Sequence, residues 1–185
     1  MNKSFTLGIK LFVITSIAGL LLAFTNSLTE PIIIARQQQQ LKDSLGVILE
    51  NAENFEELDS KDSSPDIIGA YKGTDGSKTV GYVFEIDEPG GYGGNIHFLI
   101  GFDDQMKLTG FKSISHSESA GFGAKMDDPE FNEGLVGTDA TKEVSASKDG
   151  SGENEILAIS GATYSTSTIV NGINSAREFA EGLEK

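Results

Sequence analysis

An uncharged run near the N-terminus constrains the fold of this chain more than any other feature. The 18 residues Leu11–Leu28 carry no charged side chain, and Phe5–Ile9 extend this apolar stretch through Lys10. A helix needs about 20 residues to cross a bilayer, and the stem of a lysine can lie along apolar surface while its ammonium reaches water. No Ala-x-Ala cleavage site follows, and no cysteine is available for lipid attachment, which favours a retained anchor over a cleaved signal peptide. We therefore predict a short tail and a transmembrane helix over residues 1–28.

The charges that flank the run bear on its orientation. Lys3 and Lys10 lie on the N-terminal side, whereas Arg36 and Lys42 lie on the other. Because cytoplasmic segments are enriched in Lys and Arg, we expect a cytoplasmic tail and an extracytoplasmic C-terminal part.

A stalk is predicted to follow the anchor. Pro31 suits the first turn of a new helix and Glu30 suits its positive end, so we expect a boundary at Thr29–Pro31. Residues 32–50 have apolar side chains at helical spacing, whereas residues 51–66 are acidic and polar. Residues 29–66 therefore read as a stalk helix and an irregular connector.

From Ile67 the hydrophobic period changes to two, which is typical of half-buried strands. Four segments share this alternation or border it: 67–71, 80–86, 96–102 and 108–114. They predict an antiparallel meander of about four strands. A short helix over Pro129–Leu135, a loop over 138–154 and a last strand over 156–159 are expected next. Strands first and helices afterwards indicate an α+β domain over residues 67–185.

The hydroxyl-rich segment Ser160–Thr168 lies before a predicted C-terminal helix, whose apolar residues from Ile169 to Leu183 recur every three or four positions. Short hydroxyls at 165–167 are candidate N-caps, which places Thr163 just before the helix. Free N–H groups and the helix dipole favour a phosphate at such a position. The alternative is a capped helix with no ligand.

Two further segments are candidates for a binding site. Pro89–Gly94 lacks the lysine of a P-loop and the order of a dinucleotide motif, and reads as a glycine-rich hairpin. His116–Lys125 predicts a tight loop after a strand, which offers N–H groups and hydroxyls to a ring or a phosphate.

Composition excludes several function classes. The net charge of −14 argues against a nucleic-acid partner, because few cations are available to neutralise phosphates. Without cysteine there are no disulfides, cysteine-ligated clusters or thiol nucleophiles. Acidic pairs such as Asp103–Asp104 and Asp127–Asp128 are typical of solvated turns; a surface calcium ion is the alternative there, without EF-hand spacing.

The sequence disfavours hydrolase and zinc chemistry. A hydrolase would combine His116 with Ser160 or Ser117 and an acid such as Glu118, but no nucleophile elbow is present. The two histidines, His97 and His116, lie on separate strands without a His-Glu-x-x-His spacing. We therefore expect neither a catalytic side chain nor a metal ligand.

Three segments in this order resemble the FMN-binding domain found in the G subunit of Rnf complexes and in the B and C subunits of the sodium-pumping NADH:quinone oxidoreductase. Ser160–Thr163 is similar to its flavinylation motif, although Leu157 stands where the family has aspartate. His116–Lys125 is similar to its His-x-Glu-Thr-Pro-Gly-Leu-Gly-Ala-Lys segment, with serine, alanine and phenylalanine at 119, 120 and 122. Gly91–Gly94 is similar to its Gly-Tyr-Gly-Gly segment, where backbone can approach the flavin closely.

The resemblance implies a covalent FMN, joined by its phosphate to Thr163 by a flavin transferase. The residues that it implies around this cofactor come from the three segments: Tyr92, His116, Glu118, Ser119, Gly121, Phe122, Gly123, Ser160, Gly161, Ala162, Thr163 and Tyr164. Four aromatic residues are candidates to stack on the ring: Tyr82, Tyr92, Phe122 and Tyr164.

By resemblance, the chain is an electron-transfer subunit of a membrane redox-driven ion pump of the ferredoxin:NAD oxidoreductase type. The cofactor carries the redox chemistry, and the partners are the bilayer, other membrane subunits of the complex and, during maturation, the transferase. The expected location is the cell (inner) membrane, with a single span and an extracytoplasmic C-terminal domain. The alternatives are the C subunit of the quinone-reducing relative and an anchored binding module without a cofactor.

Overall fold

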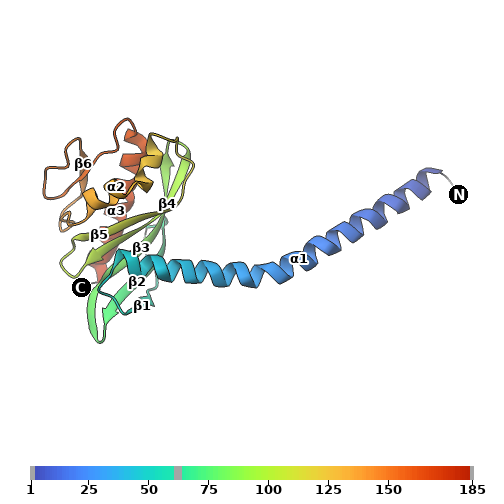
Figure 1. The fold of residues 1–185 in the computed structure, drawn as a ribbon, viewed down its shortest axis with the longest axis horizontal. Coiled ribbons are helices and arrows are strands. Elements are labelled where there is room, and N and C mark those ends of the chain that lie inside the picture. The colour runs from blue at the N-terminus through green and yellow to red at the C-terminus, as the bar shows by residue number, and fades with distance from the viewer. Residues whose placement is uncertain (1–2, 61–63, 184–185) are drawn as a thin grey trace. The chain divides into compact units, whose positions relative to one another are not determined.

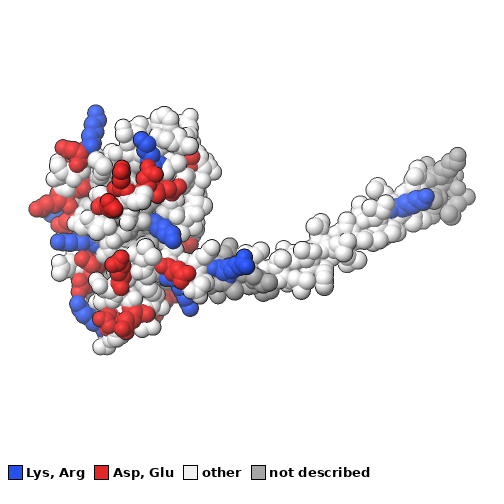
Figure 2. Space-filling view, in the orientation of Figure 1, with Lys and Arg blue, Asp and Glu red and all other residues white. Residues whose placement is uncertain are grey.

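The computed structural model describes residues 3–60 and 64–183. The chain forms two compact units, Met1–Asp43 and Ser44–Lys185. The second is called the folded unit below. Acidic side chains are spread over the face of this unit that Figure 2 shows.

A single helix, α1 (Lys3–Ile48), replaces the two helices expected at the N-terminus. The predicted boundary at Thr29–Pro31 is therefore wrong. Proline removes one hydrogen bond of the helical ladder, and long apolar helices tolerate this loss. Within α1, the segment Leu7–Glu30 is long and apolar enough to cross a membrane.

The folded unit contains one sheet of five strands in chain order, which is the predicted meander with one strand added (Figure 1). Neighbouring strands are antiparallel. The strands are β1 (Asn54–Glu57), β2 (Ile67–Asp75), β3 (Lys78–Gly91), β4 (Gly94–Asp103) and β5 (Leu108–Ser115).

Strand β1 corrects the expectation of an irregular connector over 51–66. Its sequence, Asn-Phe-Glu-Glu, has almost no apolar alternation, so the period-two signal is weak. The strand forms because its backbone pairs with residues 71–74 of β2, from Glu57 opposite Tyr71 to Asn54 opposite Thr74.

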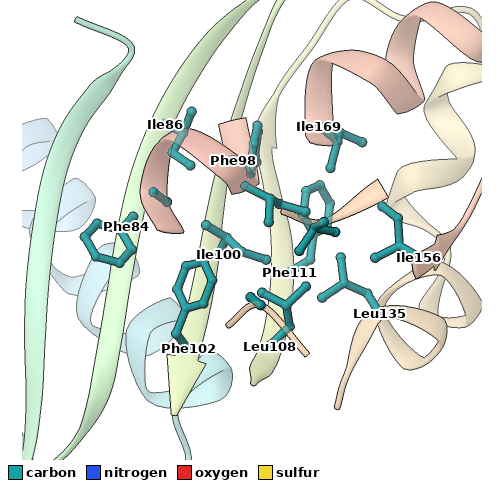
Figure 3. Packing of buried hydrophobic residues seen from close by; sticks show 14 of the residues in the cluster. Phe84, Ile86, Phe98, Ile100, Phe102, Leu108, Phe111, Leu135, Ile156 and Ile169 are labelled. Atoms are coloured by element: carbon teal, nitrogen blue, oxygen red, sulfur yellow. The ribbon is translucent and has the colours of Figure 1, made fainter. Parts of the chain in front are cut away.

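Helix α3 (Thr163–Leu183) covers one face of the sheet, where it packs on β3 and β4. Its residues Ile169, Ile173 and Ala176 are fully buried. Figure 3 shows aromatic and aliphatic side chains of the sheet, such as Phe98 and Phe111, gathered with Ile169 in this core.

The other face of the sheet is also partly buried. Strands β3 and β4 therefore carry buried side chains on both faces, whereas the alternating pattern predicted burial on one face. Val83 and Leu99 on this face are fully buried. The end of α1 supplies cover there: Ile48 is buried, and a Cβ added at Gly101 would overlap its side chain. Glycine on the sheet thus lets the helix approach.

The chain between β5 and α3 contains η1 (Gly123–Asp127), the predicted short helix α2 (Pro129–Leu135), β6 (Ser145–Ser147) and β7 (Glu155–Leu157). The segment 138–154 is therefore not a loop throughout. The expected last strand exists as β7, and it pairs in parallel with β6. Asn174 of α3 bonds to both backbone groups of Val144 and so holds this region against the helix.

Candidate functional site

Three segments far apart in the sequence line a cavity of about 300 Å³. They are the β3–β4 hairpin, the loop after β5 and the start of α3. The lining residues are Tyr92, Glu118, Ser119, Phe122, Gly123, Gly161, Ala162, Thr163, Tyr164 and Ser165. Nine of the residues expected around a cofactor are thus brought together, whereas Ser160, His116 and Gly121 do not line this cavity.

A turn with left-handed backbone leads into α3. Gly161 has φ of 78°, a conformation that a side chain disfavours, and a Cβ there would lie 3.2 Å from the ring of Phe122. The helix then begins at Thr163, whose side chain is exposed. The N–H of Thr166 makes the first backbone bond of this helix, to the carbonyl of Ala162 at 3.0 Å. The N–H groups of 163–165 precede this bond and are available to an anion.

The expected N-caps at 165–167 are wrong, because these residues lie inside the helix. Ser165 and Thr166 are buried, and their hydroxyls have other partners. Thr166 accepts from Ile159 N–H and donates to the Ala162 carbonyl, while Ser165 donates to Glu118. Local sequence suggested Ser165 as a cap and gave no sign that it faces the cavity.

Glu118 supplies a carboxyl group to the cavity wall, and 9% of this residue is exposed. Its Oε1 accepts from the N–H of Gly93 at 2.9 Å, and its Oε2 accepts from the Ser165 hydroxyl at 2.5 Å. One carboxylate therefore joins the hairpin, the loop after β5 and α3.

Aromatic side chains form the rim of the cavity. Tyr92 is 75% exposed, Phe122 56% and Tyr164 69%. Among the described residues of the folded unit, these three are the exposed aromatic side chains, and all three line this cavity. Exposed aromatic groups gathered at one place indicate a binding surface. Tyr82, the fourth stacking candidate, is a correction: it is buried in the core beside Phe84, because it faces α3 along β3.

His116 shapes the loop and does not face the cavity. Its Nδ1 accepts from the backbone N–H of Glu118 at 3.1 Å, and its Nε2 lies 3.0 Å from Asp127. Both ring nitrogens thus have partners other than Ser160. Ser160 lines a separate groove together with Leu157. This arrangement disfavours the hydrolase hypothesis. Among the described residues, no group of three or more potential ligands could hold a metal ion.

The cavity suits a planar aromatic ligand with a phosphate. Tyrosine and phenylalanine rings favour stacking, and the N–H groups of the first turn of α3 favour an anion beside the Thr163 hydroxyl. A volume of about 300 Å³ is at the lower end for small-molecule sites, which leaves part of such a ligand exposed. These features fit FMN.

Known proteins resemble this chain in sequence and in fold. Residues 91–178 match the FMN-binding domain family. The G subunit of the ion-translocating oxidoreductase complex of Methanosarcina acetivorans is 33% identical, over 95% of this chain and 94% of that relative. The G subunit of the Na(+)-translocating ferredoxin:NAD(+) oxidoreductase complex of Acetobacterium woodii is 29% identical, over 98% of this chain and 93% of that relative. In fold, the chain resembles the crystal structure of the C subunit of the Na(+)-translocating NADH-quinone reductase of Parabacteroides distasonis, with a TM-score of 0.53 and 20% identity over 63% of each chain.

Proposed function

The chain belongs to the G-subunit family of ion-translocating oxidoreductase complexes, and on this premise we propose that it carries FMN covalently on Thr163 as an electron-transfer subunit. Relatives named as G subunits match along nearly the whole chain, which favours this function over that of the quinone-reducing relative's C subunit. The pump in which it works would be a ferredoxin:NAD oxidoreductase, the chemistry named for the Acetobacterium woodii relative.

The position of Thr163 carries the proposal. Its side chain is exposed, it lines the cavity, and it is the first residue of α3. A phosphate esterified to this hydroxyl would lie beside the free N–H groups of the first turn. Formation of the ester joins the threonine oxygen to phosphorus, breaks the bond from phosphorus to the leaving group of an activated flavin nucleotide, and releases the hydroxyl proton.

FMN supplies the redox chemistry, and the protein supplies location and surroundings. Attachment through the phosphate prevents loss of the cofactor and leaves the ring electronically unmodified. Tyr92, Phe122 and Tyr164 offer stacking surfaces at the cavity rim. Their exposure would leave the ring accessible to electron donors and acceptors.

We further propose that residues 1–28 anchor the chain by one span and that the FMN-binding domain is extracytoplasmic. Lys3 and Lys10 on the N-terminal side support a cytoplasmic tail. The other membrane subunits of the complex would be its partners, and a flavin transferase would act on it during maturation.

The decisive experiment is co-expression of the full chain with a flavin transferase, followed by denaturing electrophoresis and peptide mass mapping. We expect a fluorescent band under ultraviolet light and the FMN mass increment on the peptide containing Thr163. Thr163→Ala should be dark, whereas Ser167→Ala, which changes an exposed hydroxyl of the same helix outside the cavity, should still fluoresce. A dark wild-type band would contradict the proposal and favour an anchored module without a cofactor.

A further inference from the structure

A buried carboxylate connects all three segments that enclose the cavity. The partners of Glu118 lie 25 residues before it, at Gly93, and 47 residues after it, at Ser165. Each carboxylate oxygen accepts one hydrogen bond from one of these donors. A glutamine could accept from Gly93 through its oxygen, but its NH₂ group could only donate to Ser165, whose own proton would then lose this acceptor. A carboxylate accepts from both donors at once and makes both hydrogen bonds charge-assisted.

The neighbouring glycines leave room for this contact. A Cβ at Gly91 would lie 2.6 Å from Oε1 of Glu118. A Cβ at Gly123 would overlap both Oε2 of Glu118 and Oγ of Ser165. The carboxylate of Glu118 thus explains sterically why glycine stands at positions 91 and 123, in addition to any close approach of a ligand.

The contact with Ser165 acts on the start of α3. Ser165 follows Thr163 by two residues, within the same helical turn. Ser165 is 1% exposed, so its hydroxyl has little access to water as a substitute partner. Fixing Ser165 therefore fixes the turn that carries the Thr163 hydroxyl and the free N–H groups. Groups held within a fraction of an ångström of the reacting geometry raise reaction rates.

We propose that Glu118 is the positioning residue of the flavin attachment site, an inference that rests on the function proposed above. Its carboxylate holds the first turn of α3 through Ser165 and the hairpin through Gly93. The cavity is thereby organised before the flavin is attached. Glu118 takes no part in the ester bond.

The test measures the initial rate of flavin attachment to the full chain by purified transferase with a flavin dinucleotide donor. The rate is read from the mass of the peptide containing Thr163. Glu118→Gln and Ser165→Ala should each slow attachment by roughly tenfold or more, because each removes a buried hydrogen bond to a charged group. The double variant should be no slower than the slower single variant, because both changes remove the same contact. Glu130→Gln and Ser167→Ala, exposed residues with matched chemistry, should react at the wild-type rate.

Single-variant rates within about twofold of wild type would overturn the inference, as would a double variant whose defect is the product of the two single defects. Thermal midpoints identify variants that fail to fold; if Glu118→Gln is one of them, Ser165→Ala decides, since it leaves the bond to Gly93.

Hydrogen exchange separates this inference from the proposed function. The amides of Thr166 and Ser167 should exchange about fivefold faster or more in Ser165→Ala than in the wild type, because the first turn opens more often. Unchanged exchange would overturn the role of Glu118 even if Thr163 is modified. Faster exchange in the variant, combined with a wild-type chain that never acquires flavin, would contradict the proposed function while supporting the contact between Glu118 and Ser165.

Discussion

The hydroxyl oxygen of Thr166 lies 3.1 Å from the backbone nitrogen of Ile159, seven residues earlier in the chain. The same hydroxyl donates to the carbonyl of Ala162 at 3.0 Å. One side chain thus satisfies two backbone groups of the turn Ile159–Ala162 and ties this turn to α3. All of these contacts are buried, so water is a poor replacement.

Thr166→Val should destabilise the folded unit. Valine keeps the shape of threonine but cannot accept from Ile159 N–H, which stays buried without that partner. The expected loss in the free energy of unfolding is about 1–3 kcal/mol. Chemical denaturation of the full chain in detergent measures it. Ser167→Ala, at the next and exposed position, should change stability by less than about 0.5 kcal/mol.

Ile48→Ala should also destabilise the folded unit, because the end of α1 is part of its core. Ile48 is buried against the sheet beside Gly101. Truncation of a buried isoleucine to alanine costs about 2–5 kcal/mol. Val47→Ala is the matched control, since Val47 is 67% exposed, and its denaturation midpoint should stay near that of the wild type. Equal midpoints for the two variants would show that this turn of α1 does not support the sheet.

The alternating segments of the sheet could be predicted from the sequence because their signal is local. Ile96, Phe98 and Ile100 have a period of two that needs no partner to be recognised, and they lie on one face of β4. Strand β1 lacks this signal, and its formation depends on pairing with β2. The helix boundary expected at Thr29–Pro31 is absent for a different reason. The local preference of proline for the start of a helix is overridden here within one long helix.

The candidate site could be predicted in composition but not in arrangement. The motifs identified most of the residues around the cavity, including Thr163 and Phe122. They did not separate Glu118, which faces the cavity, from His116, which turns to Asp127. The position of Glu118 depends on its hydrogen bonds to Gly93 and Ser165, which lie 25 and 47 residues away in the chain. No local sequence pattern contains such contacts.

Stability should fall as the pH rises through the titration of Glu88. Glu88 is 7% exposed, and its Oε2 has no hydrogen-bond partner among the described residues. Burial, with a smaller contribution from the charge of Asp66, raises the pKa of Glu88 from its ordinary 4.5 to about 7. The folded state therefore binds the proton more tightly than the unfolded state. This contribution to stability is complete below pH 4.5 and is lost as the pH rises towards about 7.

Glu88→Gln tests this linkage because glutamine cannot ionise. The variant should lose most of the decline in melting temperature between pH 4.5 and 7, and it should be more stable than the wild type above pH 7. Thermal unfolding across this range measures both effects. Glu133→Gln, an exposed change of the same kind, should reproduce the wild-type profile. A wild-type profile for Glu88→Gln would assign the pH dependence to other groups.

Tyr92→Ala should free an attached flavin ring without unfolding the protein. Tyr92 is 75% exposed at the cavity rim, so its loss removes little buried surface. A stacked aromatic pair is worth about 0.5–1.5 kcal/mol, which corresponds to a roughly two- to tenfold change in the ratio of stacked to free ring. Time-resolved fluorescence anisotropy of the flavinylated chain should therefore decay faster in the variant, while the thermal midpoint stays the same. Tyr92→Phe retains the ring and should keep the slow decay. If both variants decay like the wild type, the flavin ring does not stack on Tyr92, and Phe122 and Tyr164 become the residues to test.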